Sequence, residues 1–404
     1  MRTFIIILLV LAVLIGGAVL YLSATTPKSA EQVRFPLSSS NRALLAHVPD
    51  TAEWFALIPS ASMLHRTLLA NPVTRDAVLQ WTHEHELPRP WMLGGADIAV
   101  WKTGKTTSYA VRLDAFRALL VRVWLLLASN ADARWEGSTL IMHDVVPHPR
   151  KVDLEPLLRL MNGLPPGEVL AVQRETARGA FPPIARPAVT SLKIAANEIF
   201  LVSRAATNEI REEREIRAQF PRSAMLSASF ATPPRILGDL NRLVGARIDS
   251  LAGNGGSIAL YSVDTGTFIP RPRGVIVLPA DAHARAELEG IRDAVELVGE
   301  TRDLGDRLLV SFDRTSMSTY LKDVFEPASW PATRWALRLD PQPLVPVLRK
   351  AGDNPGLRFA TPRIHRAARD LRRWIDALGN ADVVEAADSV AGGVEELRVR
   401  VASK

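Results

Sequence analysis

The sequence predicts an α+β protein, in which an N-terminal transmembrane helix is followed by repeated antiparallel units of split-βαβ (ferredoxin-like) element order. Three observations lead to this prediction. An uncharged apolar run opens the chain, segments with strand and helix periodicity alternate after it, and the order of these segments recurs. A chain of 404 residues also exceeds one ordinary hydrophobic core, which indicates several domains.

The apolar run occupies residues 4–22 (FIIILLVLAVLIGGAVLYL) and carries no charge. At about 1.5 Å per residue it spans roughly 29 Å, close to the hydrocarbon thickness of a bilayer. Arg2 precedes the run, so we expect the N-terminus to stay in the cytoplasm and the chain to emerge outside. The alternative is a cleaved signal peptide, but such a segment has an apolar region of roughly 7–15 residues and a small-x-small cleavage site. Leu22 stands where that site requires a small residue, so we favour an uncleaved anchor over residues 1–23.

Residues 24–45 are polar, contain serine and proline, and show no periodicity. This composition is typical of a flexible connection. We therefore predict a tether between the anchor and the folded part.

The first predicted α+β unit covers residues 46–150. Its expected elements are strands at 53–58, 96–101, 108–113 and 138–143, a helical stripe over 63–81, and a helix capped by Asp114. The segment KTGKTT (102–107) lies between two of the strands and predicts their turn.

The second unit, residues 222–330, repeats this order. Its expected elements are strands at 224–230, 257–263, 274–278 and 307–312, with helices beginning at Pro234 and covering 282–298. A connecting β-rich region, 151–221, contains strands at 168–172, 189–194 and 199–202 and a polar helix over 208–220.

A C-terminal partial unit, residues 331–404, completes the chain. It contains a strand at 334–339, a helix that starts at Asp340-Pro341, a helix over 364–378, and a strand after Gly392-Gly393.

Two strand ends resemble each other, NEIFLVSR at 197–204 and DRLLVSFD at 306–313. With the single anchor and the repeated α+β units, they resemble a family of exported bacterial proteins known only as a domain of unknown function. The resemblance covers the organisation of most of residues 1–404 and includes no signature motif. It implies a location in the cell envelope, and it implies no activity and no functional residue.

Asp264-Thr265-Gly266-Thr267 resembles the catalytic loop of an aspartic protease. That chemistry needs two carboxylates close enough to share a proton, and the chain contains no second D-[ST]-G. The motif also falls between two predicted strands, where KTGKTT falls in the first unit. Asp, Thr and Gly favour turns for backbone reasons, so we interpret the motif as a hairpin turn.

Two further motifs are incomplete. Gly104-Lys105-Thr106 has Ala99 where a phosphate-binding loop requires its first glycine. His83 and His85 have no third ligand at a metal-binding spacing. The chain has no cysteine, which excludes disulfides and thiolate chemistry. We therefore expect no catalytic residue, cofactor or metal.

One helix presents a basic face. Within and beside 364–378, four arginines oppose the apolar stripe, Arg363, Arg366, Arg369 and Arg373, and Arg372 lies beside them. Such a face suits anionic lipid headgroups, acidic glycans or an acidic protein. The alternative is the ordinary solvated surface of an arginine-rich chain. The net charge of +6 is too modest and too dispersed to indicate nucleic acid.

Together these patterns predict a single-pass protein of the bacterial inner (cytoplasmic) membrane, with its N-terminus in the cytoplasm and most of the chain in the periplasm. Residues 4–22 would contact membrane lipid. The expected role is binding or scaffolding of an envelope protein partner without catalysis. The alternative function is an extracytoplasmic hydrolase that acts through Asp264.

Overall fold

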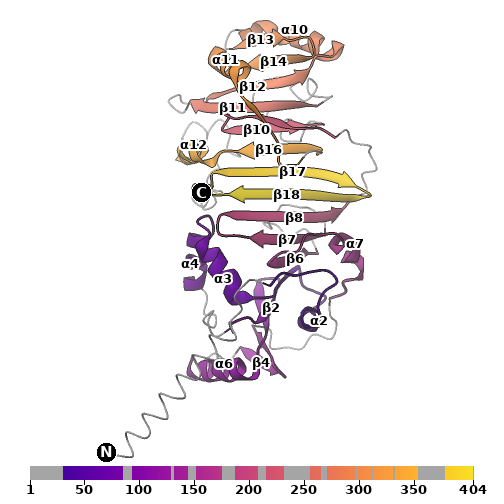
Figure 1. Ribbon diagram of the computed structural model, residues 1–404, viewed down its shortest axis with the longest axis vertical. Helices are drawn as coiled ribbons and strands as arrows, with labels where there is room; N and C mark the ends of the chain where they lie inside the picture. Colours follow the sequence, from indigo (N-terminus) through magenta and orange to yellow (C-terminus); the bar gives the residue numbers. More distant parts are fainter. Residues whose placement is uncertain are drawn as a thin grey trace, which may run out of the picture. The chain divides into compact units, whose positions relative to one another are not determined.

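The structure is a computed structural model, and it divides the chain into two compact units. The first contains Met1–Ala196 with Val202–Ala206, and the second contains Asn197–Leu201 with Thr207–Lys404. The residues that the structure describes are 31–84, 93–128, 132–143, 152–174, 187–207, 215–231, 255–264, 271–296, 299–311, 313–330, 333–353 and 378–403. Figure 1 shows the elements along the chain.

The first unit is built on a sheet with the strand order β8-β7-β6-β1-β2-β3-β5-β4. Its strands are β1 (Trp54–Ile58), β2 (Asp97–Thr103), β3 (Thr106–Arg112), β4 (Ala133–Glu136), β5 (Thr139–Met142), β6 (Val169–Gln173), β7 (Ala188–Ile194) and the end of β8 (Glu198–Ala206). β1 is central, because it pairs antiparallel with β2 on one side and with β6 on the other. This explains why three of its five residues are buried.

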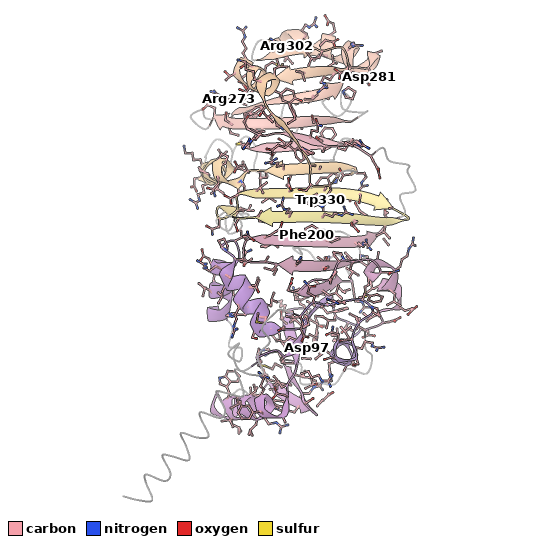
Figure 2. All side chains as sticks on the ribbon, in the orientation of Figure 1. Asp97, Phe200, Arg273, Asp281, Arg302 and Trp330 are labelled. Carbon is pink, nitrogen blue, oxygen red and sulfur yellow. The ribbon has the colours of Figure 1, made fainter. Side chains whose placement is uncertain are left out.

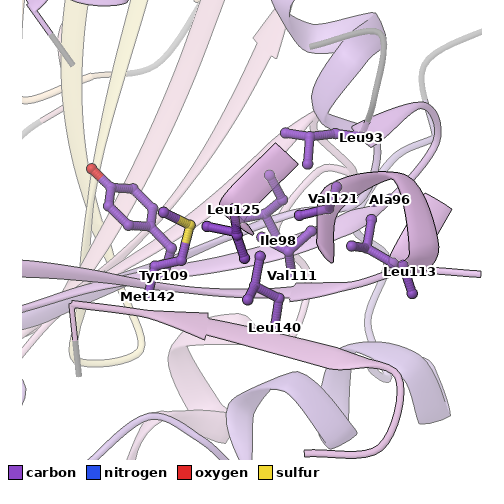
Figure 3. Close-up of a cluster of buried hydrophobic side chains, with 11 residues drawn as sticks. Leu93, Ala96, Ile98, Tyr109, Val111, Leu113, Val121, Leu125, Leu140 and Met142 are labelled. Carbon is purple, nitrogen blue, oxygen red and sulfur yellow. The ribbon is translucent and has the colours of Figure 1, made fainter. Parts of the chain in front are cut away.

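Short helices accompany this sheet: α2 (Ser39–Leu45), α3 (Ala61–Ala70), α4 (Arg75–Glu84), α6 (Ala115–Ala128), a 3-10 turn at Glu155–Leu157 and α7 (Leu158–Met161). Asp114 accepts the backbone N–H of Arg117 at 2.9 Å, as expected of the residue that caps α6. The inner side of α6 packs on strands β2, β3 and β5. Figure 3 shows Val121 and Leu125 gathered with Ile98, Val111 and Leu140 in this core.

The predicted tether is shorter than expected. Val33 pairs with Gly167 in an isolated β-bridge, and α2 begins after Ser38, whose side chain accepts the N–H of Asn41. Val33 and Leu44 are buried. Residues 31–45 thus belong to the folded first unit, and only residues 23–30 separate it from the apolar run.

The second unit has the strand order β13-β14-β12-β11-β10-β16-β17-β18. These strands are β10 (Leu226–Phe230), β11 (Gly256–Asp264), β12 (Arg271–Pro279), β13 (Glu300–Asp303), β14 (Arg307–Ser311), β16 (Trp335–Leu339), β17 (Val383–Ala391) and β18 (Val394–Ala402). Its helices are α10 (Ala282–Glu296), α11 (Arg314–Lys322) and α12 (Pro341–Asp353). A separate two-stranded ribbon pairs β9 (Gln219–Pro221) with β15 (Phe325–Pro327).

The ferredoxin-like prediction is wrong. A split-βαβ unit separates its first two strands by another strand, whereas β1 pairs directly with β2, and β10 pairs directly with β11. In the described ranges the strands of each unit form one large antiparallel sheet with few helices around it. The sequence periodicity identified most elements, but periodicity reports which face of a strand is buried and does not report which strand lies beside it.

The two units share one strand order. The series β1-β2-β3-β5-β4 corresponds to β10-β11-β12-β14-β13, and β6 and β7 extend the first series as β16 and β17 extend the second. α6 and α10 also occupy the same step, between the third strand and the following hairpin. The C-terminal partial unit is therefore not separate, because β16, β17 and β18 continue the sheet of the second unit.

Other expectations differ or lie outside the described residues. Gln219–Pro221 is a strand, so the polar helix predicted over 208–220 does not reach its expected end. No helix within the described ranges is long and apolar enough to cross a bilayer. The apolar run at 4–22, the helix predicted from Pro234 and most of the helix over 364–378 lie outside those ranges.

Candidate ligand-binding groove

The structure describes several of the residues that the sequence analysis singled out. Asp264 ends β11 opposite Arg271 of β12, so it stands at the base of the predicted hairpin. Its carboxylate lies 3.2 Å from the guanidinium of Arg273, a cation rather than a second carboxylate (Figure 2 labels Arg273). Gly104, with φ +60°, begins the turn between β2 and β3, where Thr103 pairs with Thr106. A strand-turn-strand context is wrong for a phosphate-binding loop, which opens a helix.

The remaining predicted residues do not form a site in the described structure. His83 lies near the end of α4, and His85 lies outside the described residues. Arg363, Arg366, Arg369, Arg372 and Arg373 also lie outside them. Among the described residues, no group of three histidine, aspartate or glutamate side chains is arranged to hold a metal ion.

The second unit contains a groove of about 290 Å³ that sequence analysis did not predict. Its floor lies on one row of the sheet. Across the strands this row pairs Leu309 with Val277, Val277 with Ser257, Ser257 with Ser229, Ser229 with Ala336, and Ala336 with Ala387. Paired residues of neighbouring strands point to the same face of the sheet, so this row forms a continuous surface.

Helix α11 and the two-stranded ribbon cover the two ends of that row and leave its middle open. Met317 and Tyr320 of α11 pack on Val277 and Leu309 at one end. At the other end, Phe220 of the ribbon packs on Ala336 and Ala387. Ser229 and Ser257 lie between these covers and form the floor of the groove, together with the backbone of Gly255 and Gly256.

The ribbon is held firmly beside the groove. Arg222 N donates to Val324 O at 2.9 Å, and Ser223 N donates to the carboxylate of Asp323 at 3.3 Å. Phe200 and Trp330 (labelled in Figure 2), whose ring centroids are 6.3 Å apart, pack in the same cluster as Phe220 of the ribbon. The wall of the groove is thus preformed by backbone pairing and aromatic packing.

Aromatic rings and arginines form the walls. The rings of Tyr320 and Phe325 meet edge to face with centroids 5.2 Å apart. Burial raises the pKa of the Tyr320 phenol, although the charge of Arg307 opposes this rise. The phenol is therefore neutral at physiological pH and can donate or accept a hydrogen bond.

The two arginines of the groove differ in their partners. Arg307 contacts the carboxylate of Asp306 at 3.1 Å, and this contact raises the pKa of the guanidinium. Arg217 is exposed and forms no ion pair within the described part of the chain. A cation that lines a groove without a carboxylate partner favours an anionic group in a ligand.

Glycine is required where the groove meets the strand edge. Gly255 has φ +94°, and a Cβ built there would lie 2.8 Å from Phe230 O. A Cβ on Gly256 would lie 2.8 Å from Val277 O. Both glycines therefore allow β11 to approach its neighbours closely at the groove.

One signal of this site is present in the sequence. β10 reads LSASF, and its alternate residues Ser227 and Ser229 are buried where a strand usually places apolar side chains. Arg217 lies far from Arg307 and Tyr320 in the sequence, so only the fold brings them to one groove.

No family model matches this chain, and comparison with curated proteins and with solved structures found no similar protein.

Proposed function

We propose that this chain is a membrane-anchored binding protein of the bacterial envelope, and that the groove of the second unit holds a short segment of a protein partner. The observation that carries the proposal is the open row at Ser229 and Ser257, which the aromatic rings and Arg217 flank. A preformed concave surface with apolar walls and a few directed polar groups is the usual form of a binding site.

The size of the groove favours a small part of a larger partner. Small-molecule pockets usually enclose roughly 300–1,000 Å³, and this groove of about 290 Å³ is at the lower limit. One or two side chains of a protein would fit, with an apolar group against Tyr320 and Phe325 and a carboxylate at Arg217. The serine hydroxyls of the floor can donate to a carbonyl of such a segment.

The location rests on the sequence. Residues 4–22 are long enough to cross a bilayer, and Arg2 favours a cytoplasmic N-terminus. The proposed site of action is the periplasmic side of the inner membrane. The organisation also resembles that of exported single-anchor proteins. The hydrolase alternative gains no support from Asp264, because its ionic partner is Arg273.

Site-specific photo-crosslinking of the full-length chain in its native membrane tests the binding role. A photoreactive phenylalanine analogue replaces Gln219, an exposed residue that lines the groove. We expect a discrete cross-linked product that is lost when Arg217→Glu reverses the charge of the groove. The matched control is Arg302→Glu on β13, whose side chain pairs with Glu300 away from the groove.

A product that persists unchanged with Arg217→Glu would contradict binding through the groove. If the Arg302→Glu control also loses the cross-linked product, the loss comes from the change in net charge and not from the position of Arg217 in the groove. Circular dichroism of each variant separates loss of binding from loss of folding.

A further inference from the structure

Helix α6 of the first unit is apolar on its outer side as well as on its inner side. Ala118, Val121 and Leu125 pack inward on the sheet, and Figure 3 labels Val121 and Leu125. Leu119, Val123 and Leu126 form the α6 outer face, with 57%, 48% and 81% of their surface exposed. Their i, i+4, i+7 spacing places them in one stripe along the helix.

The fold does not require this apolar stripe. The corresponding helix of the second unit, α10, buries Ala284 and Leu288 against its sheet. Its exposed residues at the same i, i+4, i+7 spacing are Arg285, Glu289 and Arg292. Arg285 pairs with Asp303, and Arg292 pairs with Glu289, both at 2.9 Å. Charged side chains therefore occupy the exposed side of α10 in the second unit, whereas leucine and valine occupy the exposed side of α6 in the first.

The charges of α6 also fit an anionic, apolar surface. The helix sequence AFRALLVRVWLLLA contains no acidic residue. Arg117 is buried and pairs with Asp114. Arg122 is exposed beside the stripe, with its guanidinium 4.6 Å from the centre of the Trp135 ring. A stripe of leucine and valine with an arginine and a tryptophan at its border matches the interface of a bilayer, where apolar side chains enter the acyl region and cations meet phosphate groups.

We propose that the α6 outer face docks on the surface of the lipid bilayer in which the chain is anchored. The proposal rests on the anchor in the proposed function. In the sequence, the apolar run at 4–22 precedes the first unit, which contains α6, and the described structure begins at residue 31. The intervening residues 23–30 can span at most about 28 Å, so the first unit stays beside the membrane. The unit joined directly to the anchor carries the apolar helix, and the unit further along the chain carries the charged one.

The absence of cysteine provides a direct test, because one introduced cysteine is the only labelled thiol. Leu126→Cys is introduced into the full-length chain, labelled with an environment-sensitive NBD fluorophore, and reconstituted into vesicles of phosphatidylethanolamine and phosphatidylglycerol. The matched control is Glu289→Cys, on the exposed side of α10. We expect blue-shifted emission from the label at 126 and strong quenching by doxyl groups on the lipid acyl chains. The label at 289 should emit as it does in water.

Emission from residue 126 that resembles water, or that doxyl lipids do not quench, would overturn the docking. If that label is shielded and a bis-maleimide joins two copies of the unlabelled Leu126→Cys chain through position 126, a second copy covers α6 and the proposal is wrong. Alkaline carbonate extraction of the same vesicles tests the anchor separately. A chain that resists extraction while the label stays in water retains its anchor and disproves the docking, whereas an extracted chain disproves the anchor.

Discussion

Arg334, which immediately precedes β16, donates from Nε to Oδ2 of Asp388 on β17 at 2.8 Å, and only 3% of the Asp388 side chain is exposed. The same guanidinium contacts Glu395 of β18 at 2.5 Å. This cluster joins three neighbouring strands of the second unit at the level of the row that forms the groove floor, because Ala336 and Ala387 follow in register. Charges placed inside a sheet require such pairing, since an isolated buried carboxylate is costly.

We predict that Arg334→Ala lowers the free energy of unfolding by about 3–5 kcal/mol, because it leaves Asp388 buried without its cation. Urea denaturation followed by tryptophan fluorescence measures this change. The control is Arg302→Ala, which removes a half-exposed partner of Glu300 and should cost less than about 1 kcal/mol. Equal effects of the two substitutions would show that burial of Asp388 does not determine the loss.

Gly255→Ala and Gly290→Ala should change stability in opposite directions. At Gly255 the added Cβ meets Phe230 O at 2.8 Å, and the backbone has φ +94°, so we expect a loss of about 1–3 kcal/mol. Gly290 lies within α10, and its Cβ would meet no atom within 4 Å. Alanine there should add about 0.5–1 kcal/mol, because it favours the helix. Thermal unfolding of both variants decides the question, and a stabilising Gly255→Ala would contradict the described strand approach.

Asp97 and Asp114 of the first unit predict opposite pH dependences. Burial raises the pKa of Asp97, although a hydrogen bond from Ser40 and the charge of Arg112 oppose the rise. Burial also acts to raise the pKa of Asp114, but its hydrogen bonds and ion pair with Arg117 lower it overall. Ionisation of Asp97 therefore destabilises the fold, and this effect is complete above the folded pKa of Asp97. Ionised Asp114 stabilises the fold in full above the unfolded pKa of 3.8. This contribution is lost as the pH falls through the folded pKa of Asp114.

The asparagine variants separate these two effects. Asp97→Asn should raise the urea midpoint at pH 7, and the gain should vanish as the pH falls through the folded pKa of Asp97 towards 3.8. Asp114→Asn should lower the midpoint at pH 7, and its deficit should disappear only below pH 3.8. Parallel pH profiles for the two variants would show that neither carboxylate behaves as described.

The sequence predicted individual elements better than their assembly. Asp340-Pro341 indicated the start of α12, and Asp340 accepts the N–H of Gln342 at 3.1 Å as expected at a helix start. Gly392-Gly393 indicated the turn before β18. The short strands β4 (ARWE) and β13 (ETRD) were missed because they are charged and show little alternation. β17 was missed because it buries Glu385 and Asp388, acids that depend on arginines from other strands.

The groove was less predictable than the fold. Serine in a sequence normally indicates a turn or a surface, so Ser229 and Ser257 gave no sign that they lie opposite each other. Their meaning depends on which row of the sheet α11 and the ribbon leave uncovered. That property follows from long-range strand pairing, and local patterns do not report it.

Asp264→Asn should leave both stability and binding nearly unchanged. The side chains of Asp264 and Arg273 are 35% and 48% exposed, and exposed ion pairs usually contribute less than about 1 kcal/mol. A catalytic aspartate of a protease would need a second carboxylate to share its proton, whereas the carboxylate of Asp264 faces the guanidinium of Arg273. Thermal unfolding and the Gln219 cross-linking assay measure the two expected outcomes. Peptide cleavage at acid pH by the wild-type chain, abolished by Asp264→Asn and retained by Arg273→Ala, would instead identify Asp264 as catalytic and contradict its interpretation as a hairpin residue.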